Sequence, residues 1–201
     1  MIKNIFPIPI YEAFLESFNS IKFDILKDTI THVESLGKYE HPHAQGGMIA
    51  TPGEGKFKLE NISYGSVIET FVNEHLKIYW NQLHYTEDFE PYIVNCWATR
   101  STNGASWGSH AHPPFPLAGV FYVNASPEQG NIVFESPLEI LLGCQPIKDI
   151  GTCPFFEHTE DAISGKLLLF PGWLKHKVQS NPTDNPRVIF GFDIGQRPVK
   201  N

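Results

Sequence analysis

The amino-terminal part of the chain carries apolar residues at helical spacing in two stretches. Between residues 11 and 36 the apolar positions recur mostly every three or four residues, which predicts one or two helices with an apolar stripe. Residues 66–83 show the same period, and Ser66 followed by Glu69 fits a capping box at a helix start. Residues 37–65 are rich in Gly, Pro, His and Lys without a sustained period, so we expect a long loop there.

From residue 90 the pattern changes to short alternating or β-branched runs between turn signals. A series of short strands at this spacing is typical of a two-sheet jelly roll. We therefore expect a mostly β fold with a double-stranded β-helix core at residues 91–201 and a helical lead-in at residues 1–90. The helices would cover one sheet and leave the inner face of the other free to line a pocket. Residues 136–164 show no clear period and predict a long insertion. The seven runs are residues 92–100, 107–112, 117–124, 130–135, 166–170, 174–179 and 187–194.

Length and charge narrow the class of protein. A chain of 201 residues with 41% hydrophobic and 18% charged residues fits one globular domain, residues 1–201. The net charge of −7 and the absence of a Lys/Arg run argue against a nucleic-acid or membrane partner. The longest apolar runs fall far short of the ~20 residues that span a bilayer. Three cysteines without a CxxC pair favour a reducing cytoplasm. We expect a small-molecule or peptide substrate, and a homodimer stays open.

The sharpest local feature is the sequence His110-Ala111-His112 at the end of a predicted strand. On an extended chain residues i and i+2 point to the same side, so both imidazoles can bind one metal ion. His176 follows the Pro171-Gly172 turn on a later strand, and a jelly roll can bring the two strands together. Imidazole is a common ligand of iron, zinc and nickel. A second pair, His41 and His43, lies in a polar loop and is interpreted as solvated surface.

Arg187 strengthens this interpretation. It stands eleven residues after His176, at the start of the last predicted strand, and residues 179–186 between them form a predicted hairpin loop. The hairpin can place Arg187 beside His176 with its guanidinium inside the barrel. A buried guanidinium needs an anion, and its planar fork suits a carboxylate. The natural anion is a dicarboxylate whose other end chelates the metal.

These residues resemble the iron(II)/2-oxoglutarate-dependent dioxygenases. Within that superfamily the chain is most similar to small oxygenases typical of phages and marine bacteria, related to the prolyl-hydroxylase-like group. The resemblance implies Fe(II), 2-oxoglutarate as co-substrate and O2, with release of succinate and CO2 as the substrate is hydroxylated. It also implies that His110, His112 and His176 bind the metal and that Arg187 holds the distal carboxylate of 2-oxoglutarate. The resembling stretches are Ile5–Tyr11, Asn95–Trp97, Ser109–Pro113, Ala118–Val123, Gly130–Pro137 and Leu168–His176, together with Arg187.

One position departs from the pattern of the superfamily. Most members carry Asp or Glu where His112 stands. A carboxylate cancels one charge of the iron, whereas a third imidazole cancels none, so the site would be more electropositive. Glu135, at the end of a predicted strand, remains an alternative ligand to His112.

Further polar and aromatic residues are candidates for the co-substrate and substrate pockets. Asn95 and Tyr122 could bind the co-substrate, or they could be strand-end polar groups satisfied in the ordinary way. Trp97, Phe115 and Trp173 could wall the substrate pocket, or they could be core and rim packing. No side-chain general base is expected, and the substrate itself is unreadable: a peptide side chain, a free amino acid, a nucleobase and a small metabolite all remain open.

Two other function classes compete with this hypothesis. A cupin-like three-His metallo-dioxygenase would work without 2-oxoglutarate, but the Glu that cupins carry soon after their HxH motif is absent between Pro113 and Val120. The gap from His112 to His176 is also long for a cupin, and Arg187 would have no obvious function there. A non-enzymatic jelly roll, which binds a ligand or builds a structure, is the other alternative.

Overall fold

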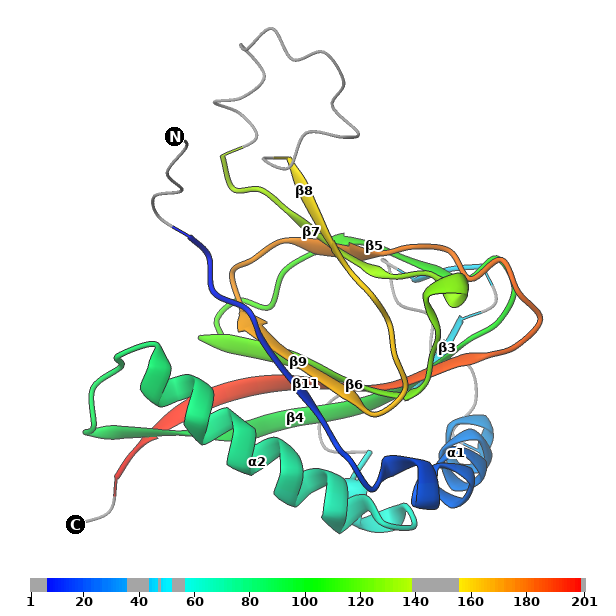
Figure 1. Cartoon of the computed structure of the whole chain (residues 1–201), viewed down its shortest axis with the longest axis horizontal. Helices are drawn as coiled ribbons and strands as arrows, with labels where there is room; N and C mark the ends of the chain where they lie inside the picture. Colours follow the sequence, from blue (N-terminus) through cyan, green and yellow to red (C-terminus); the bar gives the residue numbers. More distant parts are fainter. Residues whose placement is uncertain (1–6, 36–43, 47, 52–56, 139–155, 200–201) are drawn as a thin grey trace, which may run out of the picture.

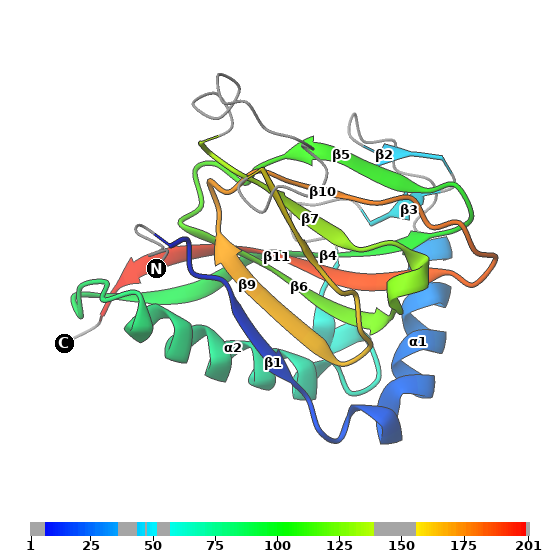
Figure 2. The same cartoon turned by 45° about the horizontal axis from the view of Figure 1, so that its top comes forward.

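Two antiparallel sheets face each other, and two helices pack on the outer side of the larger one (Figures 1 and 2). The computed structural model describes residues 7–35, 44–46, 48–51, 57–138 and 156–199. The six-stranded sheet has the order β1 (Tyr11–Phe14), β9 (Lys166–Pro171), β6 (Leu117–Asn124), β11 (Arg187–Pro198), β4 (Phe89–Ser101) and β3 (Met48–Ala50). The five-stranded sheet has the order β2 (Ala44–Gln45), β5 (Ser106–His110), β10 (His176–Val178), β7 (Ile132–Glu135) and β8 (Glu157–Glu160). The predicted fold class, a jelly-roll core with N-terminal helices, is confirmed.

The helices α1 (Phe18–Ser35) and α2 (Gly65–Gln82) bury their apolar stripes against the six-stranded sheet. Ile25 from α1 and Leu76 from α2 are fully enclosed, in one cluster with Phe121 and Phe190 of the sheet. A sheet that is apolar on this face must be covered, and the helices cover it. Among the described residues no helix combines the length and the apolar character needed to cross a membrane.

Strand alternation gives the six-stranded sheet two different faces. Along β11, Val188 and Phe190 belong to the cluster beneath the helices, whereas Arg187, Ile189 and Gly191 line a cavity between the sheets. Side chains on a strand alternate between its faces, so a single strand serves both the core and the cavity. The inner face of the six-stranded sheet is therefore the one that carries candidate functional residues.

Two expectations about the amino-terminal part were wrong in detail. Residues 11–14 form β1 rather than helix, because this segment pairs with β9 from Tyr11 opposite Leu169 to Phe14 opposite Lys166. A helical spacing of apolar residues cannot reveal a partner strand that lies far along the chain. The capping box is also absent, since α2 begins at Gly65 after the N-cap Tyr64, whose φ of 59° is left-handed and whose side chain makes no cap hydrogen bond.

The loops predicted at residues 37–65 and 136–164 contain short elements. Strands β2 and β3 and a 3-10 turn, η1 (Leu59–Asn61), lie in the first segment, and β8 lies near the end of the second. A further 3-10 turn, η2 (Pro127–Gln129), follows β6. These pieces are too short to produce a periodic pattern of their own. His41 and His43 lie outside the described residues, so their predicted surface position stays a prediction.

Candidate metal centre and its cavity

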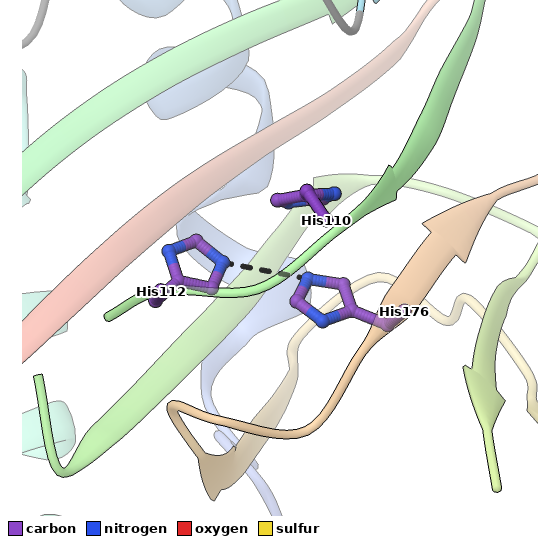
Figure 3. Close-up of side chains that lie close together, drawn as sticks. All are labelled: His110, His112 and His176. Atoms are coloured by element: carbon purple, nitrogen blue, oxygen red, sulfur yellow. Dashed lines mark hydrogen bonds between the residues drawn. The ribbon is translucent and has the colours of Figure 1, made fainter. Parts of the chain in front are cut away.

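Three histidines from two segments of the chain meet between the sheets (Figure 3). His110 ends β5 and His176 begins β10, and these two residues are direct cross-strand partners. His112 lies two residues beyond the end of β5. One ligand nitrogen from each ring lies within 4.8 Å of the other two. The three side chains that the sequence predicted as metal ligands therefore form one group that could hold a metal ion.

The position of His112 depends on a loop contact as well as on strand parity. Its backbone N–H donates to Gly172 O at 2.7 Å, and Gly172 N–H donates to Pro116 O at 2.9 Å. These two bonds attach the loop after β5 to the Pro171-Gly172 turn after β9. A side chain at Gly172 would overlap the carbonyl of Phe115, so only glycine permits this approach. The alternation of an extended strand, used in the prediction, explains His110 but not the whole position of His112.

Hydrogen bonds fix the orientation of each ring. Nδ1 of His110 lies 2.9 Å from Gly108 O, and Nδ1 of His176 lies 2.9 Å from Leu174 O. Nδ1 of His112 lies 2.8 Å from a carboxylate oxygen of Asp193. Each of these partners is an acceptor, so Nδ1 is the nitrogen that carries the proton when the ring is neutral. The lone pair of each ring then lies on Nε2, the atom that a metal would use.

The spacing of the Nε2 atoms fits a shared cation. His112 Nε2 and His176 Nε2 are 3.4 Å apart, and both carry lone pairs in the tautomers just described. Two nitrogens that each lie about 2.1 Å from one metal are themselves about 3.0 to 3.4 Å apart for common coordination angles. Burial, together with the neighbouring His110, lowers the pKa of His176 to about 3, so this ring stays neutral at physiological pH. A neutral ring is the form that binds metal.

The histidines border a cavity of about 420 Å³. Its wall also contains Arg187, which is 3% exposed. Nη1 of Arg187 donates to the carbonyls of Gln129 at 2.6 Å, Gly130 at 2.8 Å and Gln179 at 3.3 Å. Burial lowers the pKa of Arg187 to about 10, which still leaves it protonated at neutral pH. Three carbonyls thus hold a buried cation in place.

Among the described residues no carboxylate pairs with Arg187, and the hydrogen bonds that Arg187 makes with them all use Nη1. Ser101 lies directly opposite Arg187 on β4, and Thr99 follows on the same face of that strand. Both residues line the cavity together with Tyr122, whose pKa is raised mainly by burial. A guanidinium and three hydroxyl groups in one cavity are suited to a carboxylate ligand.

The remaining predicted residues divide into three groups. Tyr122 and Trp97 line the cavity, and the indole of Trp97 stacks against His112 with centroids 5.9 Å apart and planes 20° apart. Asn95 does not line it and instead donates to Asp193 at 3.0 Å. Phe115 and Trp173 also lie outside the cavity wall, and Trp173 is 54% exposed. The roles assigned to all of these residues stay predictions.

The alternative ligand Glu135 is engaged elsewhere. Its carboxylate accepts a hydrogen bond from Ser109 at 2.7 Å, and it does not belong to the group of ligand atoms formed by the histidines. Sequence reasoning missed Asp193, Thr99 and Ser101. Asp193 shares strand parity with Arg187 on the last strand, and Thr99 shares parity with Trp97 on β4. Once one inward-facing residue had been identified on each strand, this shared parity could have predicted that these residues also face the cavity.

Gly191 makes room for Trp97 beside the metal centre. The two residues are partners across β11 and β4, and a Cβ at Gly191 would overlap the indole ring. We expect Gly191→Ala to reduce the free energy of unfolding by about 1–3 kcal/mol through overpacking, measured by denaturant unfolding. In a Trp97→Ala background the same substitution should cost much less. An equal cost in both backgrounds would show that Gly191 is constrained by something other than Trp97.

Comparisons with known proteins agree with this geometry. Residues 95–193 match the model of a family described as "Putative 2OG-Fe(II) oxygenase". The structure is similar to that of a Pseudomonas putida prolyl-4-hydroxylase, with a TM-score of 0.59, 15% identity, and coverage of 96% of this chain and 94% of that one. It is also similar to Streptomyces hygroscopicus HygX with nickel and 2-oxoglutarate bound, with a TM-score of 0.60, 11% identity, and coverage of 94% and 83%. A comparison with curated protein sequences found no match.

A viral collagen prolyl hydroxylase from Paramecium Bursaria Chlorella virus-1, in its 2OG complex, is a further neighbour. Its TM-score is 0.51 at 14% identity, with coverage of 92% of this chain and 95% of that one. At these identities the structural likeness concerns the fold alone. The segment of the chain that matches the family model contains all three histidines, Arg187 and Asp193.

Proposed function

We propose that this chain, whose residues 95–193 match the family model described as "Putative 2OG-Fe(II) oxygenase", is an iron(II)/2-oxoglutarate-dependent oxygenase that hydroxylates an organic substrate with release of succinate and CO2. The observation that carries the proposal is the content of one cavity. Each of three imidazoles offers one ring nitrogen within 4.8 Å of the other two, and a buried guanidinium without a carboxylate partner among the described residues lines the same space. A metal and a dicarboxylate would satisfy both.

The donor set fits the metal. Three neutral nitrogen ligands suit Fe(II) and leave other coordination positions for co-substrate and oxygen. His110, His112 and His176 would hold the ion. When bound, Fe(II) and 2-oxoglutarate together supply the oxidising chemistry, which belongs to the cofactors rather than to the chain.

The residues of the chain bind, orient and exclude water. Arg187 would hold the distal carboxylate of 2-oxoglutarate through the donors that its carbonyl partners leave unused, with Tyr122, Thr99 and Ser101 beside it. Trp97 would keep the ring of His112 in its plane and shield the centre from solvent. Exclusion of water by these residues would protect the chemistry of the bound cofactors from side reactions.

The two competing hypotheses account for fewer of these observations. A three-His dioxygenase without 2-oxoglutarate would give Arg187 no anion, although a buried guanidinium is costly to leave unpaired. A non-enzymatic jelly roll would give no reason for the Nε2 atoms of His112 and His176 to face each other at 3.4 Å. The substrate, a homodimer and a cytoplasmic location stay predictions from the sequence.

Succinate formation in the absence of a substrate tests the proposal. We expect the purified protein with Fe(II), 2-oxoglutarate and oxygen to produce succinate slowly, because family chemistry runs uncoupled when no substrate is bound. Omission of Fe(II), or addition of a chelator, should stop it. If the protein bound Fe(II) but formed no succinate, and 2-oxoglutarate left its metal affinity unchanged, the result would favour a three-His dioxygenase that works without 2-oxoglutarate.

A further inference from the structure

We propose that Asp193, oriented by Asn95, is a positioning residue that provides the negative charge of the metal centre through His112. The inference rests on the proposed function, since it requires a metal at the three histidines. It concerns two residues of this chain that lie behind the ligands rather than among them. Asp193 contacts His112, Asn95 contacts Asp193, and neither residue belongs to the group of ligand atoms.

The first step is the missing charge. Three neutral imidazoles bring no negative charge to a divalent cation, and the Nδ1 atoms of His110 and His176 lie against the backbone carbonyls of Gly108 and Leu174. His112 is the ligand with a different partner, the carboxylate of Asp193 at 2.8 Å. A carboxylate that accepts from the distal nitrogen makes an imidazole a stronger donor to metal and fixes its tautomer.

The second step is the rigidity of the carboxylate. Oδ1 of Asp193 accepts from His112, and Oδ2 accepts from Asn95 Nδ2 at 3.0 Å, so both oxygens have a defined partner. Asn95 lies directly opposite Asp193 in the register of β4 and β11, just before an irregularity in the pairing of β11. Two rigid strands therefore orient the carboxylate, which a single side-chain contact could not do.

The third step is the way the ring of His112 is enclosed. Trp97 stacks on the ring, the backbone N–H of His112 donates to Gly172 O, and the carboxylate of Asp193 binds Nδ1 of the ring. Stacking and the backbone bond limit where the ring lies, but neither chooses which nitrogen carries the proton. Only the hydrogen bond to Asp193 directs the lone pair of Nε2 into the cavity.

The test compares two Asp-to-Asn substitutions with Co(II) as a spectroscopic probe of the metal site. Asp193→Asn keeps an oxygen acceptor but removes the charge. Asp161→Asn is the matched control, because Asp161 also accepts from an asparagine, Asn131, at 3.3 Å but lies outside the cavity wall. We expect Asp193→Asn to weaken Co(II) binding about 10- to 100-fold and to shift the ligand-field absorption bands, and the control to change neither.

Asn95→Ala should have a smaller effect in the same direction, about three- to tenfold, because the carboxylate remains but loses one of its two partners. Unfolding of each metal-free variant is followed in parallel. A purely structural role would lower stability without moving the absorption bands of the bound ion. If the Co(II) affinity of Asp193→Asn stayed within about threefold of that of wild type, with unchanged absorption bands, the inference would be overturned.

A measurement on the unaltered protein covers the case in which the Asp193 variant does not fold. Nitrogen NMR of the imidazole rings should show His112 protonated at Nδ1, both metal-free and with diamagnetic Zn(II) bound. Protonation at Nε2 in the metal-free protein would contradict the proposed role of Asp193. If wild type bound no metal at all, both the proposed function and this inference would be refuted. If wild type and Asp193→Asn bound metal equally tightly, only this inference would be refuted.

Discussion

His176→Ala should lower Fe(II) affinity by about 100-fold or more and reduce 2-oxoglutarate-dependent succinate formation below detection. Binding of a metal by several protein ligands is worth roughly 10–16 kcal/mol in small structural sites, so each ligand accounts for about 3 kcal/mol, or about 100-fold. His176 is 3% exposed and its Nε2 lies 3.4 Å from that of His112, so its replacement by alanine removes one of the ring nitrogens that would hold the metal. Equilibrium dialysis with Fe(II) under anaerobic conditions measures the affinity.

Packing around His176 requires a control for folding. The ring contacts Phe170 and Phe134, with centroids 4.8 and 5.9 Å away, so alanine would also leave a cavity. His176→Gln fills more of that space and should lose metal affinity to a comparable degree. His158→Ala removes an exposed histidine that pairs with Glu160, and it should leave metal binding unchanged. Retained Fe(II) affinity in both His176 variants would exclude this residue as a ligand.

Arg187→Gln should leave metal affinity unchanged and weaken 2-oxoglutarate binding by about 100-fold. The glutamine amide can still donate to the carbonyls of Gln129 and Gly130, whereas the charge and the planar fork are lost. A charged hydrogen-bonded pair in a buried site is worth about 2–5 kcal/mol when one partner is removed. Titration of the metal-loaded protein with 2-oxoglutarate, without oxygen, measures the difference.

Two controls make the Arg187 experiment specific. Pyruvate shares the 2-keto acid group but has no distal carboxylate, so its weak affinity should be the same in wild type and Arg187→Gln. Arg100→Gln removes an arginine from β4 that pairs with Glu34 and does not line the cavity, so it should not affect 2-oxoglutarate. Unchanged 2-oxoglutarate affinity in Arg187→Gln would refute the assignment of this co-substrate.

The pattern of the sequence was sufficient for the fold class. Alternating apolar runs predicted seven strands, and each of them overlaps a strand of the structure, from β4 to β11. The pattern failed where an element depends on a distant partner. Strand β1 exists because residues 11–14 pair with β9, and the start of α2 is set by the left-handed Tyr64 rather than by a side-chain cap.

The sequence by itself determined which side chains could carry chemistry: the HxH pair, a later histidine and an arginine eleven residues beyond it. These are residue types at fixed spacings, and strand alternation accounts for the inward positions of those that lie on strands. Only the tertiary structure decided how they combine. The bond from His112 to Gly172, the bonds of Arg187 to the carbonyls of Gln129 and Gly130, and the contact of Asn95 with Asp193 join residues that are 57 to 98 positions apart in the sequence. No local pattern encodes such contacts. The tautomers of the three rings, and with them the direction of their lone pairs, follow from those contacts.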